Sequence, residues 1–378
     1  MQKPRLMTPG PAPVPEDVLL ELARPVIHHR SAEAKEVVID VIAGLKEVFQ
    51  TKHDVLIFTA SGTGAAEAAM INTVPRGKKA IVLNAGYFAD RWVKVCKPYG
   101  IEAVSLETEW GLPVDPQQVE NALKAHPDAT MVIGTLSETS TGTGHPVEAI
   151  GKIVAETEAV FMVDGISGVG AMECRTDAWS VDLLVVGSQK ALMLPPGLSF
   201  VSVSPKAWAK IDACPTCCFY FDMKLARKKM VEFDTPFTPA HTLILALRQA
   251  LKRLRTEGIE NVWKRHARMS EACQAGVVAL GLELFSARPA EGLTVFRLPD
   301  GVKDSAVRNK LFDKFGITIV GGQDKLKGKI LRIGHMGYMD ELDVISGLAA
   351  LEMVLGEIGF AVEPGKAVTA AQRVFMAK

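Results

Sequence analysis

The stretch that decides the fold is AVFMVDGISGVGAMECRTDAWSVDLLVVGSQKALMLPPG, residues 159–197. Two short apolar runs in it, residues 160–163 and 183–186, stop at polar side chains: Asp164 after the first run, and Ser188, Gln189 and Lys190 after the second. Such runs predict buried parallel strands. Ligands of open α/β sheets bind beyond the carboxyl ends of the strands, so we expect Asp164 and Lys190 to meet in one crevice.

An acid and an amine in one crevice suit pyridoxal phosphate chemistry. A lysine amine forms a Schiff base with the aldehyde, and a carboxylate keeps the pyridine nitrogen protonated so that the ring accepts electrons. Lys190 and Asp164 fit these two catalytic roles. The alternative is an aspartate that caps a loop and a lysine on the surface, where most lysines lie. This stretch alone leaves both interpretations open.

Five motifs in order resemble the class V aminotransferases, in particular the alanine/serine–glyoxylate (serine–pyruvate) branch. They are SGTGAAEAA at 61–69, SETSTG at 137–142, VDGISGVG at 163–170, VGSQKALMLPPG at 186–197 and LRIGHMG at 331–337. The resemblance extends from TPGP at residues 8–11 to LRIG at 331–334. It implies the α/β fold of type I pyridoxal-phosphate transferases: a large domain with a mostly parallel, seven-stranded type of sheet, and a small C-terminal α+β domain.

Length and charge limit the possible functions. The chain has 378 residues, 48% of them hydrophobic, which favours two domains. Lys plus Arg and Asp plus Glu number 43 each, so nothing indicates a nucleic-acid partner. No run of about eighteen apolar residues occurs and the first residues lack an apolar signal segment, so we expect no membrane association and a cytoplasmic protein.

The six cysteines are scattered apart from CPTCC, which holds Cys214, Cys217 and Cys218. A structural zinc site needs a second Cys or His pair at matched spacing, and none is near, so we expect no metal site and no disulfide framework. The role of the three clustered cysteines stays open. No cysteine follows Cys273, which argues against a cysteine desulfurase.

Apolar spacing and proline content predict three regions. Residues 1–20 form an irregular arm, because Pro9, Pro11, Pro13 and Pro15 oppose a helix; the resemblance implies that this arm wraps over a partner subunit. Residues 21–257 form the large domain and residues 258–378 the small one. The large domain should hold helices at 34–49, 65–72 and 239–257 and strands at 55–58, 80–83, 103–106, 131–135, 160–163, 183–186 and 200–203. The small domain should hold helices at 261–279, 305–315 and 339–358 and strands at 293–297, 317–320 and 329–333.

The turn at Ser61, Gly62 and Thr63 lies between a strand and a helix, where free N–H groups and the helix dipole favour a phosphate. A glycine-rich turn alone is more often a plain tight turn, but the resemblance places the cofactor phosphate here. It also implies cofactor contacts by Thr139, Ile166 and Gln189, with Ser188 a weaker candidate and Glu138 ordering the loop.

The resemblance further implies that Phe88 stacks on the pyridine, at a position where close relatives carry Trp. Tyr87 is the competing candidate, and an ordinary core aromatic is the alternative. Thr238 would reach the phosphate of the neighbouring subunit.

Arg332, at a predicted strand end, is the candidate that binds the substrate carboxylate, since a guanidinium offers two parallel donors. The alternative is a surface ion pair. His28, His29 and His335 could line the pocket, but we expect structural roles for them.

The resemblance implies a transaminase that moves an amino group from alanine or serine to glyoxylate or pyruvate, by ping-pong kinetics through the Lys190 Schiff base, in a homodimer with shared active sites. Other class V activities remain open: aminoethylphosphonate or ureidoglycine aminotransferase, or a lyase. A different class, a non-enzymatic subunit of a redox complex that uses CPTCC, is the further alternative.

Overall fold

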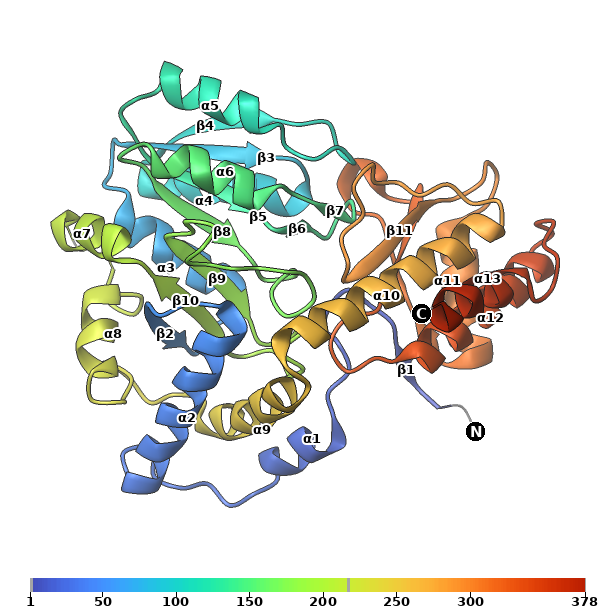
Figure 1. Ribbon diagram of the computed structural model, residues 1–378, viewed down its shortest axis with the longest axis horizontal. Coiled ribbons are helices and arrows are strands. Elements are labelled where there is room, and N and C mark those ends of the chain that lie inside the picture. Colours follow the sequence, from blue (N-terminus) through green and yellow to red (C-terminus); the bar gives the residue numbers. More distant parts are fainter. Residues whose placement is uncertain (1–2, 216–217, 378) are drawn as a thin grey trace.

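The computed structural model describes residues 3–215 and 218–377, and its centre is a seven-stranded sheet (Figure 1). The strand order is β2 (Asp54–Phe58), β10 (Ser199–Val203), β9 (Leu183–Gly187), β8 (Val160–Asp164), β5 (Ala129–Thr135), β3 (Lys79–Asn84) and β4 (Glu102–Glu107). Only β10 runs antiparallel to its neighbours in this sheet. The predicted mostly parallel sheet is therefore confirmed, and each of its strands matches a predicted apolar run to within two residues at either end.

Helices cover both faces of this sheet, which explains why its central strands are buried at every position. One face packs against α3 (Gly62–Thr73), α4 (Tyr87–Tyr99), α7 (Pro205–Ala213) and α8 (Met223–Met230). The other packs against α2 (Ala32–Phe49), α5 (Pro116–Ala125), α6 (Val147–Ala155) and α9 (His241–Glu257). The helix α2 begins where Ser31 Oγ accepts a hydrogen bond from Ala34 N at 3.2 Å, an N-cap worth about 1 kcal/mol.

The rest of the chain forms a second body beside the sheet, reached through α10 (Ile259–Ala279) (Figure 1). It holds a three-stranded sheet in the order β11 (Leu293–Arg297), β14 (Ile330–Gly334), β13 (Val320–Gly321), with α11 (Asp304–Phe315), the short η1 (Asp324–Leu326) and α12 (Glu341–Glu357). The predicted strand at 317–320 is two short strands, β12 (Ile317–Thr318) and β13. The helix α13 (Lys366–Met376) is not predicted by the sequence, because its buried residues are only Ala367, Ala371 and Phe375. The domain boundary at residues 257/258 stays a prediction.

The first twenty residues differ from the expected irregular arm. Arg5–Leu6 forms β1, which pairs in parallel with β12, and Glu16–Leu22 forms α1. The prediction of an irregular arm is wrong from Glu16 onward, because Pro15 lies at the N-cap and precedes the helix instead of interrupting it. Between β1 and α1 the chain passes over the carboxyl end of β9, where Ala12 N donates to the Gln189 carbonyl at 2.9 Å.

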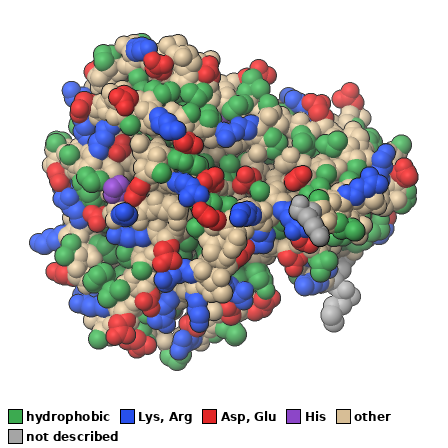
Figure 2. All heavy atoms as spheres, in the orientation of Figure 1, with side chains coloured by type: hydrophobic (Ala, Val, Ile, Leu, Met, Phe, Trp, Pro, Cys, Tyr) green, Lys and Arg blue, Asp and Glu red, His purple; other side chains and the backbone are tan. Residues whose placement is uncertain are grey.

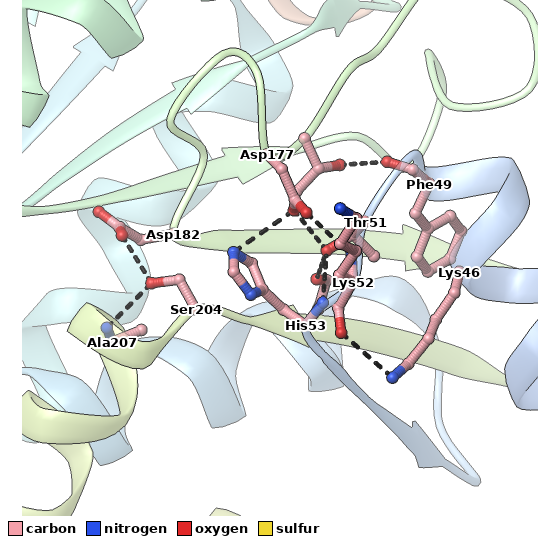
Figure 3. A network of polar contacts seen from close by, with 11 residues as sticks. Lys46, Phe49, Thr51, Lys52, His53, Asp177, Asp182, Ser204 and Ala207 are labelled. Atoms are coloured by element: carbon pink, nitrogen blue, oxygen red, sulfur yellow. Dashed lines mark hydrogen bonds and ion pairs between the residues drawn. The ribbon is translucent and has the colours of Figure 1, made fainter.

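A polar network lies at the opposite end of the sheet, near the start of β2 and β9 (Figure 3). Asp177 accepts hydrogen bonds from Thr51 Oγ1 at 2.6 Å and from Lys52 N at 2.8 Å, and His53 Nε2 lies 3.4 Å from its carboxylate. Asp182 accepts from Ser204 Oγ at 2.6 Å. These contacts join the loops that precede β2 and β9. The network of Thr51, His53 and Asp177 therefore stabilises the end of the sheet opposite Lys190.

Lys, Arg, Asp and Glu side chains are interspersed over the face seen in Figure 2, in keeping with a formal net charge of zero. Within the two described stretches, no helix combines the length and apolar character needed to cross a bilayer.

Candidate active site

The carboxyl ends of β8 and β9 bring Asp164 and Lys190 to one edge of the sheet. The two strands are parallel neighbours in register from Met162 to Asp164, and Lys190 follows the end of β9 by three residues. The side chain of Asp164 is buried, with 5% of the residue exposed. Lys190 Nζ donates to the Pro9 carbonyl at 2.6 Å, and a Cβ on Gly10 would collide with that amine. The two groups thus face a site that the N-terminal segment covers.

Burial raises the pKa of the Asp164 carboxyl to about 6. The hydrogen bond that Asp164 Oδ1 accepts from Ile166 N at 3.0 Å lowers this pKa, as do the charges of Lys190 and Arg91, while the nearby Glu138 raises it. At neutral pH the carboxyl is therefore mainly ionised in a buried setting.

Burial also lowers the pKa of the Lys190 amine, to about 8. The negative charge of Asp164 opposes this effect, and the positive charges of Arg332 and Arg91 strengthen it. About one tenth of the amines are then neutral at pH 7, far more than for an exposed lysine. A neutral amine is the form that attacks an aldehyde.

This pKa predicts how the apoprotein takes up pyridoxal phosphate. The rate of covalent attachment should rise with pH, because the neutral fraction of Lys190 grows, and should level off above a midpoint near pH 8. Stopped-flow absorbance from pH 6 to about pH 10 measures it, with free lysine, whose pKa is about 10.4, as the control. A midpoint at the value of free lysine would contradict the lowered pKa.

The phosphate-binding turn of the sequence prediction is the start of α3. The helix begins at Gly62, three residues earlier than predicted, and Ser61 is its N-cap without a side-chain capping bond. A Cβ on Gly62 would lie 2.5 Å from Ile166 Cδ1, so the absence of a side chain lets this turn pack against the loop that follows Asp164. Free N–H groups and the helix dipole at this end suit an anion.

The first turn of α4 carries the aromatic candidate Phe88. The Arg91 guanidinium lies 5.1 Å from the centre of this ring, and the Tyr87 ring meets it edge-on at 5.4 Å. Glu138 accepts hydrogen bonds from Phe88 N at 3.4 Å and Ala89 N at 2.9 Å. Glu138 is fully buried, and burial raises its pKa. It therefore orders its own loop, as expected, and also the start of α4.

The remaining cofactor candidates lie around the same edge. Thr139 follows β6 (Ser137–Glu138), which pairs with β7 (Thr143–Gly144), and its Oγ1 donates to Ser167 Oγ at 2.5 Å. Gln189 Oε1 is buried and accepts no hydrogen bond within the described residues. The unpaired, buried Oε1 of Gln189 beside Lys190 and the uncapped start of α3 fit a ligand that carries a phosphate and a polar ring. The residues present therefore suit pyridoxal phosphate.

Arg332 lies on β14, with 6% of the residue exposed. Its Nε donates to the Gly321 carbonyl at 2.9 Å, and its Nη1 donates to the Thr139 carbonyl at 3.1 Å and to Gln323 Oε1 at 3.4 Å. Burial lowers its pKa to about 10. No carboxylate of residues 3–215 or 218–377 forms an ion pair with it, so the surface ion pair considered above is not what the structure contains. A buried guanidinium with donors to spare suits a carboxylate ligand.

Other candidates are not brought to this site. Thr238 is exposed, in a surface hollow lined by Thr59 and Tyr220. The Ser188 hydroxyl is already used, because it donates to the Pro195 carbonyl at 2.8 Å and accepts from Leu198 N.

The structural roles expected for the three histidines stay a prediction. The rings of His28 and His29 stack on each other, and the buried His335 Nε2 lies 2.9 Å from Thr294 Oγ1. Of the clustered cysteines, Cys214 is buried and Cys218 is half-buried, while Cys217 lies outside the described residues. Among the residues that are described, no group of three His, Cys, Asp or Glu side chains is arranged to hold a metal ion.

Two residues of the site were missed by the sequence analysis. Arg91 donates to Thr63 Oγ1 at 3.0 Å, and Pro9 supplies the carbonyl that accepts from Lys190. Both contacts join segments that are far apart in the chain. The only sequence signal for Arg91 is its helical spacing from Phe88, which places the two side chains on the same face of a helix.

Known proteins are similar to this chain in both sequence and fold. The Aminotransferase class-V family matches residues 14–344. The chain is 41% identical to the soluble hydrogenase small subunit of Synechococcus sp. (98% of both chains) and 33% identical to the serine–glyoxylate aminotransferase of Methylorubrum extorquens (97% of this chain, 94% of the relative). Its structure is similar to that of ureidoglycine–glyoxylate aminotransferase from Bacillus subtilis, with a TM-score of 0.93, 30% identity and complete coverage of both chains.

Proposed function

Because this chain belongs to the aminotransferase class-V family and is a pyridoxal-phosphate-dependent aminotransferase, we propose that it moves the amino group of alanine or serine to glyoxylate or pyruvate. The observation that carries the proposal is that the buried Asp164 and the half-buried Lys190 lie at the ends of adjoining strands. Arg332, which forms no ion pair among the described residues, is close enough to lower the pKa of the amine.

When bound, pyridoxal phosphate supplies an aldehyde that takes up the amino group and a ring that withdraws electrons from the substrate Cα. In the proposed assignment Arg332 binds the substrate carboxylate, which places Cα within reach of Lys190. Lys190 Nζ would act as the general base that takes the proton from the substrate Cα, and the resulting ammonium would act as the general acid that gives a proton back. Asp164 carries the negative charge that keeps a proton on the ring nitrogen.

The other proposed contacts hold the cofactor in place. Ser61, Gly62 and Thr63 would bind the phosphate at the start of α3, Phe88 would stack on the ring, and Gln189 and Thr139 would bind polar ring substituents, with Ile166 packing beneath. The segment over Lys190, from Pro9 to Ala12, shields the amine from water.

A donor and acceptor matrix tests the proposed function. Purified protein loaded with pyridoxal phosphate is assayed with alanine, serine, aspartate, ureidoglycine and aminoethylphosphonate against glyoxylate and pyruvate, reading keto-acid formation. Alanine or serine with glyoxylate or pyruvate should be the best pairs, with the parallel double-reciprocal lines of ping-pong kinetics. Turnover confined to ureidoglycine or aminoethylphosphonate would identify one of the other class V activities. No turnover with any pair would contradict the proposal and favour the redox-subunit alternative.

Replacing Arg332 with glutamine should raise KM for the amino donor by about 10- to 100-fold, because a hydrogen bond to a charged group contributes about 1.5–3 kcal/mol. The loss of kcat should be smaller, since the lost contact is already present in the bound substrate. Steady-state kinetics measure this, with Arg297→Gln, an exposed arginine of β11, as the matched control. An unchanged KM in Arg332→Gln would remove this residue from substrate binding.

We also propose a homodimer with shared active sites. Large apolar side chains are exposed on α1 and just after it, with Leu20 70% and Val26 76% accessible, and others are exposed at Phe219, Val231 and Phe233. Such surfaces favour association. Thr238 would then reach the cofactor phosphate of the partner subunit. Sedimentation of a monomer at micromolar concentration would contradict this arrangement.

A cytoplasmic location is the remaining part of the proposal, supported by scattered cysteines that suggest no disulfide framework. Cell fractionation tests it, and recovery in a secreted fraction would overturn it.

A further inference from the structure

Besides Lys190 and Arg332, the site contains the half-buried Arg91, a third cation that the proposed mechanism does not use. Arg91 lies on α4, one turn after Phe88, and its positive charge lowers the pKa of both Lys190 and Asp164. Within the described parts of the chain, no carboxylate lies close enough to form an ion pair with Arg91. Its neighbour Asp90 is paired with Lys94 instead, at 2.6 Å. An unpaired arginine beside a buried site favours an anionic ligand.

The contacts of Arg91 point to one end of the site. Its Nη1 donates to Thr63 Oγ1 at 3.0 Å, in the first turn of α3, and its guanidinium lies 5.1 Å from the Phe88 ring centre. Arg332, the other arginine of this site, contacts Thr139 and Gly321 instead. The two cations therefore belong to different parts of the site, one beside the uncapped helix start and one beside the small sheet.

The hydrogen bond to Thr63 fixes what its hydroxyl can do. A threonine hydroxyl has one hydrogen to donate and two lone pairs that accept. Because Arg91 can only donate, it occupies a lone pair of Oγ1 and leaves the hydroxyl hydrogen free for an acceptor. The hydroxyl thus becomes a donor beside the free N–H groups of the helix start, and the guanidinium adds positive charge there.

We propose that Arg91 is a positioning residue for the phosphate of the cofactor, acting by holding the Thr63 hydroxyl as a donor toward that phosphate. The inference rests on the proposed function for the identity of the ligand, and it gives a role to Arg91, which takes no part in the proposed mechanism.

The test compares pyridoxal phosphate with pyridoxal, which lacks the phosphate. Equilibrium titration of the apoprotein, followed by absorbance and by quenching of tryptophan fluorescence, gives the Kd of each compound. In Arg91→Met the Kd for pyridoxal phosphate should rise by about 10- to 100-fold, as expected for the loss of a charge-assisted contact, while the Kd for pyridoxal changes by less than about threefold. Arg91→Lys, which keeps the charge but loses the planar fork, should fall between wild type and Arg91→Met.

A second variant keeps the test informative if Arg91→Met fails to fold. Thr63→Val should show the same selective loss for pyridoxal phosphate, and the double variant should lose little more than either single one, because the two residues act through one hydrogen bond. Arg297→Met is the matched control, since this guanidinium also lies over a phenyl ring, 4.7 Å from the centre of Phe285, but on the surface.

The outcomes separate the inference from the proposed function. Equal losses for both compounds in Arg91→Met would mean that Arg91 supports the Phe88 ring and would overturn the inference. An unchanged preference for the phosphorylated compound in Thr63→Val would also overturn it. A wild-type apoprotein that binds neither compound would instead contradict the proposed function.

Discussion

Replacing Lys190 with alanine should lower amino-group transfer by at least about 10⁴-fold, the largest effect expected of any single change in this chain. Lys190 is half-buried, and desolvation lowers the pKa of its amine to about 8. The amine can therefore be neutral, to attack an aldehyde, and can also carry a proton near neutral pH. An alanine can do neither. Removing a charged amine from a buried site should leave the free energy of unfolding nearly unchanged or raise it.

Initial rates at saturating concentrations of the amino donor and the keto-acid acceptor measure the loss of turnover. Thermal unfolding shows whether the variant is folded. Lys124→Ala, which removes an exposed lysine of α5 that is paired with Glu120, is the control and should keep full activity. A Lys190→Ala variant that retains even one tenth of wild-type turnover would rule out this lysine as the reacting amine.

Replacing Asp164 with asparagine should lower kcat by about 10²- to 10⁴-fold, the range typical for removal of a preorganised charge or a general acid–base group. Asparagine has nearly the same shape as aspartate, but it cannot carry the negative charge that the carboxyl has above its pKa of about 6. Because this charge raises the pKa of Lys190, the same change should move the pH midpoint for attachment of pyridoxal phosphate below about 8.

Two measurements together check the role of Asp164: kcat at neutral pH and the pH dependence of cofactor attachment. Asp128→Asn, at an exposed carboxylate paired with Lys79, should change neither. If Asp164→Asn kept kcat within about threefold and left the midpoint in place, the carboxylate would act on neither the ring nor the amine.

The sheet and the two residues at its edge follow from the sequence because they depend on local chemistry. Strands β8 and β9 are buried on both faces, so they appear as unbroken apolar runs, and the polar residues that end them lie at the carboxyl edge in any parallel sheet. The helix predicted at 305–315 also follows from local chemistry, since Gly316 ends α11 in the left-handed conformation.

The N-terminal segment and the cation near the phosphate turn depend instead on contacts between distant parts of the chain. The passage of Pro9 over Lys190 joins residues 181 positions apart, and the bond from Arg91 to Thr63 joins two helices that no local pattern places side by side. The sequence analysis does not predict α1, because four prolines suggest extended chain, although only the last of them adjoins the helix.

The central claim is that Lys190 is the amine that holds the cofactor, and one measurement tests it most directly. The apoprotein is incubated with pyridoxal phosphate, the adduct is reduced with borohydride, and the digested peptides are examined by mass spectrometry. The account predicts one stoichiometric label, on Lys190, in the peptide that follows β9. A stoichiometric label on any other lysine, or no label at saturating pyridoxal phosphate, would contradict it.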